Sequence, residues 1–217
     1  MLETKAIFLD GVPGSGKSTL SEWVTGQITS RGVSATLYPE MCSDHPLRVY
    51  EPVFTDFTQP AQASAYRERH IALFRAFVRD TLDSDAIVVV DSRLFQGTIT
   101  STYFLRMPVD EAIDFALTLL DILMPLQPAL VYIAQADMEA NWRRICAERG
   151  AFWTVRHCGI RCDADFVHAG VSWSAIQAFC LALIAKWDIE KLVLVNSDYD
   201  WESHRAAIGA FLRLNTT

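Results

Sequence analysis

The sequence lacks several features that would point to a membrane or a nucleic acid as partner. No uninterrupted apolar stretch reaches the roughly 18–20 residues of a membrane-spanning helix. The longest candidate, around 175–184, contains Gln177 and is followed by Lys186. There is no excess of basic residues either, because the formal net charge is −7, which argues against binding to a phosphate backbone. We therefore expect no membrane and no nucleic acid partner.

Signals for export and disulfide formation are also missing. No secretory signal precedes the first apolar run, and the five cysteines are an odd number, so we expect free thiols and a cytoplasmic protein. One stretch contains His157, Cys158, Cys162 and His168. Cys-x₃-Cys with a distant histidine matches structural zinc spacing only loosely, so a mobile loop with incidental thiols is the favoured interpretation.

What the sequence does contain is typical of one α/β domain covering residues 1–217. The hydrophobic fraction is 51% and the charged fraction is 21%, which allows a sizeable core. Apolar runs rich in β-formers alternate with longer helical patterns, which predicts a mostly parallel sheet with helices on both faces. The expected strands are 6–10, 33–38, 86–90, 130–134 and 192–195. The expected helices are 18–30, 61–82, 96–105, 109–124, 137–148, 173–187 and 201–214, with no periodicity over 151–171.

Residues 5–19 carry the most specific motif. Gly11, Gly16, Lys17 and Ser18 satisfy G-x-x-x-x-G-K-[ST], between an apolar strand pattern and a helical pattern, which is the context that a phosphate-binding P-loop requires. Glycines let the backbone approach phosphate oxygens closely, and the following helix N-terminus favours anions. The alternative is a glycine-rich turn before an ordinary helix. The predicted nucleotide-binding residues are Gly11, Val12, Pro13, Gly14, Ser15, Gly16, Lys17, Ser18 and Thr19.

Within this motif, Lys17 is expected to reach the β- and γ-phosphates and Ser18 to ligate Mg²⁺. Acidic residues end three predicted strands, at Asp10, Glu40 and Asp91, so three carboxylates are expected to converge on one cleft. Asp91 is the first choice as Mg²⁺ ligand or base. Glu40 is better placed as the base, because it opens the loop-rich region. For each, capping of the next turn is the alternative.

Arginines near the end of the 137–148 helix are candidates for stabilising a transferring phosphoryl group, because a guanidinium stays charged and binds oxygens bidentately. Arg143, Arg144 and Arg149 are the residues concerned, and a solvated helix surface is the alternative for each. Asn196 follows the last strand, where it is expected either to lie against the nucleotide base or to serve ordinary turn chemistry.

Together these positions resemble the thymidylate kinase-like and deoxynucleoside kinase-like branch of P-loop kinases. Members of that branch have an acidic residue after strand two, an acidic residue and an arginine after strand three, and an arginine-bearing lid after strand four. Glu40, Asp91-Ser92-Arg93 and the arginines of 143–149 fill these positions here. The stretches 91–96, 130–132 and 148–153 are also similar to a group of thymidylate kinase-like P-loop proteins.

The resemblance implies a three-layer P-loop NTPase fold, with a five-stranded parallel sheet of order 2-3-1-4-5 and a mobile lid at about 137–171. It also implies ATP with Mg²⁺ as donor, and an acceptor-side region at about 41–82. Glu40, Asp91, Arg93, Arg143 and Arg149 are then the expected catalytic residues beside Lys17.

The favoured hypothesis is a small-molecule kinase acting on a hydroxyl of a nucleoside- or antibiotic-like acceptor. The aromatic lining for it would come from Tyr50, Phe54, Phe57 and Tyr66. A nucleoside monophosphate is the alternative acceptor, with Arg48, Arg67 and Arg93 aimed at its phosphate. A nucleotide-binding switch with slow hydrolysis is the alternative from another class, although no N-K-x-D-like guanine signature is present. The apolar segment 113–124 would serve either a homodimer or the core.

Overall fold

The computed structural model describes residues 4–214, apart from the side chains of His157 and Cys158. Its centre is a sheet of five parallel strands in the order β2-β3-β1-β4-β5. This confirms the predicted fold class and strand order. The strands are β1 (Ala6–Gly11), β2 (Ala35–Tyr38), β3 (Ile87–Asp91), β4 (Ala129–Gln135) and β5 (Glu190–Asn196).

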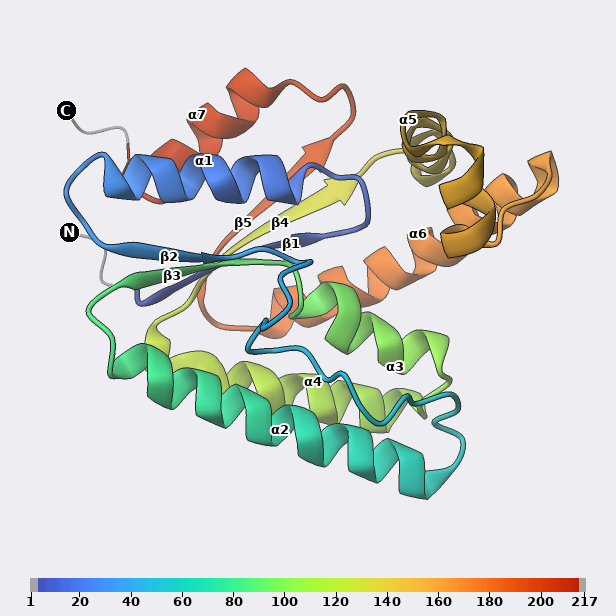
Figure 1. Cartoon of the computed structure of the whole chain (residues 1–217), viewed down its shortest axis with the longest axis horizontal. Coiled ribbons are helices and arrows are strands. Elements are labelled where there is room, and N and C mark those ends of the chain that lie inside the picture. Colours follow the sequence, from blue (N-terminus) through green and yellow to red (C-terminus); the bar gives the residue numbers. More distant parts are fainter. Residues whose placement is uncertain (1–3, 215–217) are drawn as a thin grey trace.

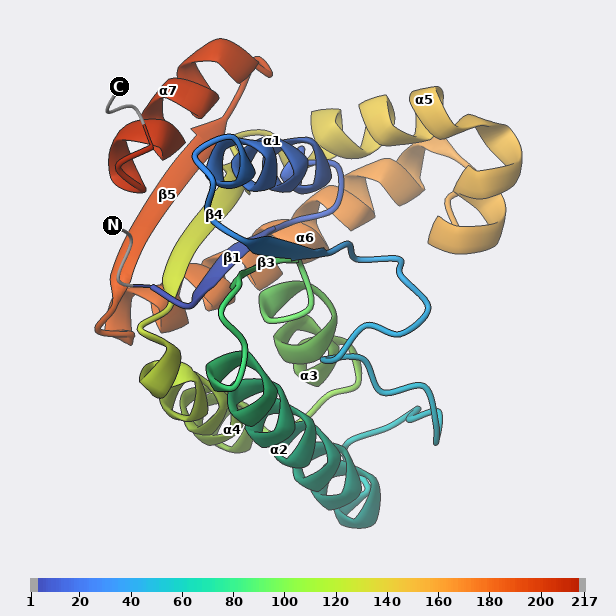
Figure 2. The same ribbon diagram turned by 60° about the vertical axis from the view of Figure 1, so that its left-hand side comes forward.

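Helices cover both faces of the sheet, which gives the three-layer arrangement (Figures 1 and 2). On one face lie α1 (Lys17–Thr29) and α7 (Trp201–Phe211). On the other lie α2 (Pro60–Leu82), α3 (Thr100–Phe104), α4 (Val109–Leu123) and the second half of α6 (Asp163–Lys186). A π-helical turn (Phe95–Ile99) precedes α3, a 3₁₀ turn (Met124–Leu126) follows α4, and α5 (Met138–Cys158) leads from β4 to α6.

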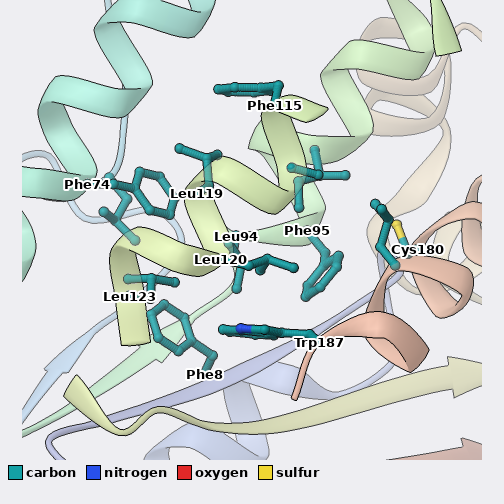
Figure 3. Close-up of a cluster of buried hydrophobic side chains, with 14 of the residues drawn as sticks. Phe8, Phe74, Leu94, Phe95, Phe115, Leu119, Leu120, Leu123, Cys180 and Trp187 are labelled. Carbon is teal, nitrogen blue, oxygen red and sulfur yellow. The ribbon is translucent and has the colours of Figure 1, made fainter. Parts of the chain in front are cut away.

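The larger core lies between the sheet and α2, α4 and α6. Phe8 of β1 packs in one cluster with Phe74 of α2, Leu119 of α4 and Trp187, the residue that follows α6 (Figure 3). The inward face of α4 is fully buried there, with Phe115 and Leu119 at 0% exposure. Burial in the protein's own core therefore accounts for the inward face of the apolar 113–124 segment, while Met124 is 41% exposed and the homodimer stays a prediction.

The region 151–171 differs from its predicted loop. Gly150 kinks α5 instead of ending it, with φ 82° and ψ 167°, and the helix continues to Cys158. After a short turn, α6 begins at Asp163, ten residues before the expected start, and the Asp165 carboxylate accepts the backbone N–H groups of Arg161 and Cys162. The helices here are largely exposed on several sides, so no apolar stripe marks them in the sequence. Together α5 and the start of α6 form a hairpin that projects from the sheet (Figure 1).

The structure also bears on two expectations about α6 and the cysteine-containing stretch. Among the described helices, α6 is long and apolar enough by length and composition to cross a membrane, as core helices often are, which corrects the expectation that no segment is. Among the described side chains, no group of three histidine, cysteine or acidic residues is arranged to hold a metal ion, and His157 and Cys158 lie outside them. The described cysteines Cys42, Cys146, Cys162 and Cys180 are free thiols, as expected.

Candidate functional site

The P-loop joins β1 to α1 at the edge of the sheet where the strands end. Gly14 and Gly16 both have positive φ values, 73° and 92°. A Cβ on Gly16 would lie 2.1 Å from the ring of Trp201, and one on Gly14 would lie 2.3 Å from the side chain of Ile145. Only glycine therefore fits at these two positions, where the loop is both left-handed and closely packed.

Lys17 is buried and its ammonium group donates to the carbonyl of Val12 at 2.8 Å. Burial lowers the pKa of Lys17 from its usual value, while the carboxylates of Asp10, Glu40 and Asp91 act to raise it. A buried cation in a loop at the start of a helix suits a polyphosphate chain.

Ser18 and Asp91 come together at the mouth of the loop. The Ser18 hydroxyl donates to Asp91 Oδ2 at 2.7 Å, and Ser92 donates to Asp91 Oδ1 at 3.3 Å. A hydroxyl and a carboxylate are hard oxygen ligands of the kind that Mg²⁺ prefers. The buried Ser15 hydroxyl has no hydrogen-bond partner among the described residues. The donor set therefore fits Mg²⁺ and a nucleotide.

These residues open onto a cavity of about 670 Å³, here called the nucleotide cavity. Three tryptophans line it besides the P-loop: Trp142 and Trp153 from α5, and Trp201 from the start of α7. Aromatic faces stack well on nucleobases. The sequence prediction missed these tryptophans, because nothing in their local pattern separates them from core residues.

Asp10 does not join the other two carboxylates, which corrects the expected convergence of three. Its side chain is fully buried and accepts four backbone N–H groups, from Gly11, Leu94, Phe95 and Gln96, at 2.7–3.1 Å. Burial raises the pKa of Asp10 to about 6, and the charge of Lys17 and the backbone hydrogen bonds limit that rise. Asp10 therefore holds the start of the P-loop and the loop after β3 in one arrangement.

Glu40 lines the nucleotide cavity as a half-buried carboxylate. Its Oε1 accepts a hydrogen bond from Gln96 Nε2 at 3.0 Å. Its backbone carbonyl accepts from Arg93, through Nε at 3.1 Å and Nη2 at 2.6 Å. Ser92 and Arg93 both have positive φ, 69° and 73°, an uncommon pair for non-glycine residues. Arg93 therefore contacts the backbone of Glu40 and does not line the nucleotide cavity.

On that side lies a second cavity of about 320 Å³, here called the acceptor cavity. Arg48 and Arg93 are its charged lining residues, and the Arg48 guanidinium lies 4.6 Å from the centre of the Tyr50 ring. No carboxylate occurs among the described lining residues. Arg67 lies elsewhere and pairs with Glu111 at 3.7 Å. The other lining residues are Leu47, Val49, Pro52, Val53, Phe54, Tyr66, His70, Gly97, Thr98, Ser101 and Leu105.

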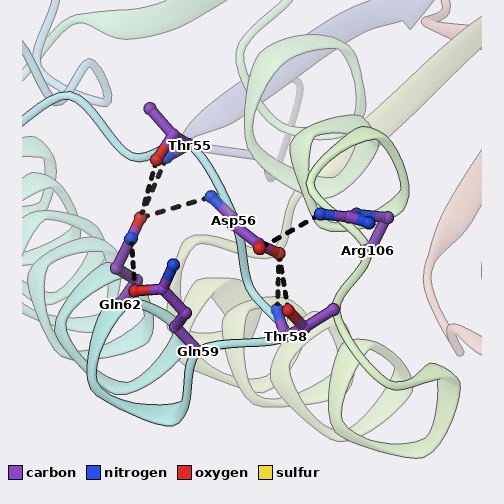
Figure 4. Close-up of polar contacts among 6 residues, drawn as sticks. All are labelled: Thr55, Asp56, Thr58, Gln59, Gln62 and Arg106. Carbon is purple, nitrogen blue, oxygen red and sulfur yellow. Dashed lines mark hydrogen bonds and ion pairs between the residues drawn. The ribbon is translucent and has the colours of Figure 1, made fainter.

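Hydrogen bonds hold the chain segment that follows this lining onto α2 and the turn after α3 (Figure 4). Gln62 accepts the backbone N–H groups of Thr55 and Asp56, and the Asp56 carboxylate pairs with Arg106 at 3.0 Å. Phe57, expected in the acceptor lining, is instead fully buried in the core. The wall of the acceptor cavity is therefore anchored from two elements.

The arginines of α5 divide between the two sides of the helix. Arg143 lies outside the nucleotide cavity and pairs with Glu139 at 2.8 Å and Asp163 at 2.7 Å. Arg144 and Arg149 both line the cavity. The structure therefore places Arg144, and not Arg143, beside the P-loop, where its Nη2 donates to the Gly14 carbonyl at 2.6 Å.

Asn196 contacts the P-loop and not the nucleotide cavity. It is fully buried, and its amide donates to the carbonyl of Ser15 at 3.3 Å. The sequence prediction missed two other residues near the loop. Asn141 donates to the carbonyl of Pro13 at 2.9 Å, and the backbone N–H of Tyr199 donates to Asn196 Oδ1 at 2.9 Å. No pattern reveals them, because they act across elements distant in the sequence.

No protein-family model matches the chain, and no curated protein matches it. Among solved structures, it is similar to a thymidylate kinase from Ehrlichia chaffeensis, with a TM-score of 0.51 and 14% identity over 94% of this chain and 97% of that one. It is also similar to polyphosphate kinase 2 from Arthrobacter aurescens TC1, with a TM-score of 0.46 and 12% identity over 97% of this chain and 66% of that one. At the identity of the thymidylate kinase, the likeness shows the three-layer P-loop fold.

Proposed function

We propose that the protein is an ATP- and Mg²⁺-dependent phosphotransferase that moves a γ-phosphoryl group to a hydroxyl of a small molecule. The observation that carries this proposal is the junction of the two cavities. Glu40 and Gln96 line the nucleotide cavity, Arg93 and Gly97 line the acceptor cavity, and Arg93 is bonded to the Glu40 carbonyl. Such a junction suits transfer between two bound molecules.

Each charged group of the nucleotide cavity then has a role. Lys17 and the N–H groups of the P-loop hold the phosphates, while Ser18 and Asp91 hold Mg²⁺. The bound ion would offset the charge of the phosphate oxygens. Arg144 and Arg149 line the same cavity from α5, where they stabilise charge that develops during transfer.

Glu40 is the proposed base. As the acceptor oxygen bonds to the γ-phosphorus, the bond from that phosphorus to the β–γ bridging oxygen breaks and ADP leaves. The hydroxyl proton passes to the Glu40 carboxylate. Gln96 donates to one oxygen of this carboxylate, which orients the other for the acceptor.

The acceptor class follows from the lining of the second cavity. Tyr50, Phe54 and Tyr66 offer aromatic surface for a nucleoside- or antibiotic-like compound. A nucleoside monophosphate is a second candidate, because Arg48 and Arg93 line the cavity with no carboxylate among the described lining residues. A nucleotide-dependent switch needs no such cavity next to its phosphates, so the arrangement favours a kinase.

The test measures ATP consumption and product formation with panels of nucleosides, nucleoside monophosphates and hydroxylated antibiotics. We expect turnover to require an acceptor, and Glu40→Gln to lower transfer about a hundredfold or more, with ATP affinity within about twofold of the wild type. Glu190→Gln, at an exposed position on β5, is the matched control. Hydrolysis at the same rate with and without every acceptor would contradict the proposal and favour a switch.

A further inference from the structure

The carbonyl groups of the P-loop are held from outside by side chains of two other elements. Asn141 and Arg144 belong to α5, and Asn196 ends β5. Each donates to a different carbonyl, so three consecutive peptide groups of the loop are bound by side chains. The bonds run from Asn141 Nδ2 to Pro13 at 2.9 Å, from Arg144 Nη2 to Gly14 at 2.6 Å, and from Asn196 Nδ2 to Ser15 at 3.3 Å.

One residue, Tyr199, contacts all three of these donors. Its hydroxyl donates to Asn141 Oδ1 at 2.9 Å, and its backbone N–H donates to Asn196 Oδ1 at 2.9 Å. Its ring lies under the Arg144 guanidinium, 3.9 Å from the ring centre. The residue itself has a positive φ of 59°. Tyr199 therefore links α5, the end of β5 and the P-loop.

The contacts with Tyr199 orient the two asparagine amides. A side-chain amide has an acceptor end and a donor end. When Tyr199 donates to the oxygen, the NH₂ group is directed at the P-loop carbonyl. Without that donor, the amide is free to turn its oxygen toward the carbonyl, which replaces an attraction with a repulsion. An amide held in this orientation in turn holds the loop carbonyl to which it donates.

The C=O and N–H groups of a trans peptide unit point in opposite directions. Holding the carbonyls of Pro13 and Ser15 therefore sets the direction of the N–H groups of Gly14 and Gly16, two residues that line the nucleotide cavity, while the Ser15 N–H donates within the loop to Val12 at 3.3 Å. We propose that Tyr199 is a positioning residue that orients the P-loop for polyphosphate, acting through Asn141, Arg144 and Asn196. This inference rests on the proposed nucleotide site. It adds that a residue outside the motif sets how well the motif binds phosphate.

The test compares wild type with Tyr199→Phe, which keeps the ring under Arg144 and removes only the hydroxyl. Calorimetry measures binding of inorganic tripolyphosphate and of ATP with Mg²⁺. Losing one oriented hydrogen bond should weaken both affinities about fivefold and leave the KM for the acceptor unchanged. Tyr103→Phe is the control, because Tyr103 is 45% exposed on α3 and lines neither cavity.

A double variant separates positioning from general loosening. If Tyr199 acts through Asn141, adding Asn141→Ala to Tyr199→Phe should weaken tripolyphosphate binding little further than Asn141→Ala alone. Unchanged binding in Tyr199→Phe, or fully additive losses, would overturn the inference and leave the nucleotide site intact. Absence of tripolyphosphate and ATP binding in the wild type would instead overturn the proposed nucleotide site, and this inference with it.

Discussion

The nucleotide cavity and the acceptor cavity lie on opposite sides of Glu40, and they hold charge differently. The nucleotide cavity carries both signs, with Lys17, Arg144 and Arg149 facing Glu22, Glu40, Asp91 and Glu148. The acceptor cavity carries Arg48 and Arg93 with no carboxylate among its described lining residues. His70, at its floor, adds no charge near neutral pH, because burial lowers its pKa to about 4.

This difference indicates what each cavity can bind. A polyphosphate with a divalent cation carries both signs itself, so a cavity of mixed charge complements it. A small cavity whose charged side chains are both cationic favours an acceptor that carries negative charge or a π-rich ring. In a chain of net charge −7, such a cavity is a local exception. If the two cavities act separately, a substitution in one should change the binding of one substrate and leave that of the other unchanged.

The largest effect on both cavities together is expected at Asp10, because it ties together the loop after β1 and the loop after β3. In Asp10→Asn the amide NH₂ would face backbone N–H donors that the carboxylate now accepts. We expect transfer to fall about a hundredfold, with weaker binding of ATP and acceptor alike. Loss confined to one substrate would contradict this link. Asp188→Asn, at an exposed position before β5, is the control.

Asp10 also predicts a pH dependence. Its pKa is raised from 3.8 to about 6 by burial, and a protonated carboxyl accepts fewer N–H groups. Wild-type transfer should therefore decline below about pH 6, an inflection that Asp10→Asn should lack. The folded state binds this proton more tightly than the unfolded state, so the contribution of Asp10 to the free energy of unfolding should rise as pH falls from 6 toward 4. As pH falls, activity should therefore decrease while stability increases. Unfolding curves of the wild type and of Asp10→Asn at several pH values check the change in stability.

A smaller effect, confined to one cavity, is expected from Arg48. Arg48→Ala should reduce the preference for a nucleoside monophosphate over its nucleoside about tenfold, because one charge-assisted contact is lost. The KM for ATP should not change. Arg67→Ala is the matched control, since that residue pairs with Glu111 outside the cavity. Equal losses for charged and neutral acceptors would show that Arg48 serves the wall of the cavity and not an anion.

The two cavities also differ in how many of their residues can be predicted from the sequence. The P-loop, its strand and its helix are contiguous, so a local pattern predicts them together, and alternation of strands and helices predicts the sheet. Ser18 and Asp91 were predicted at the mouth of the loop, because parallel strands end at one edge. The acceptor cavity is lined from several elements, so the sequence predicts Arg48 and Arg93 at one acceptor but also includes Arg67 and Phe57, which do not line the cavity.

Where prediction failed, side-chain direction or long-range contact decided the outcome. Asp10 ends a strand as Asp91 does, but its carboxylate lies in the interior among backbone N–H groups, which spacing along the chain does not reveal. Gly150 matches a helix stop, yet the chain resumes helical geometry after it. Tyr199 follows β5 in a turn, and only the folded chain brings it to α5.

The smallest effect is expected at Arg143, whereas substitution of its neighbour Arg144 should weaken ATP binding. Its pairs with Glu139 and Asp163 lie at the surface, where solvent screens such contacts and they contribute little. Arg143→Ala should therefore leave transfer within about twofold of wild type. Arg144→Ala removes the contact with Gly14 and the cation over Tyr199, so its KM for ATP should rise about tenfold. The two residues are adjacent in one helix, so both substitutions should change the helicity of α5 alike. A difference in activity between the two variants therefore reports which side chain points toward the P-loop. Equal effects would mean that the hairpin turns α5 when nucleotide binds, and that both arginines reach the phosphates.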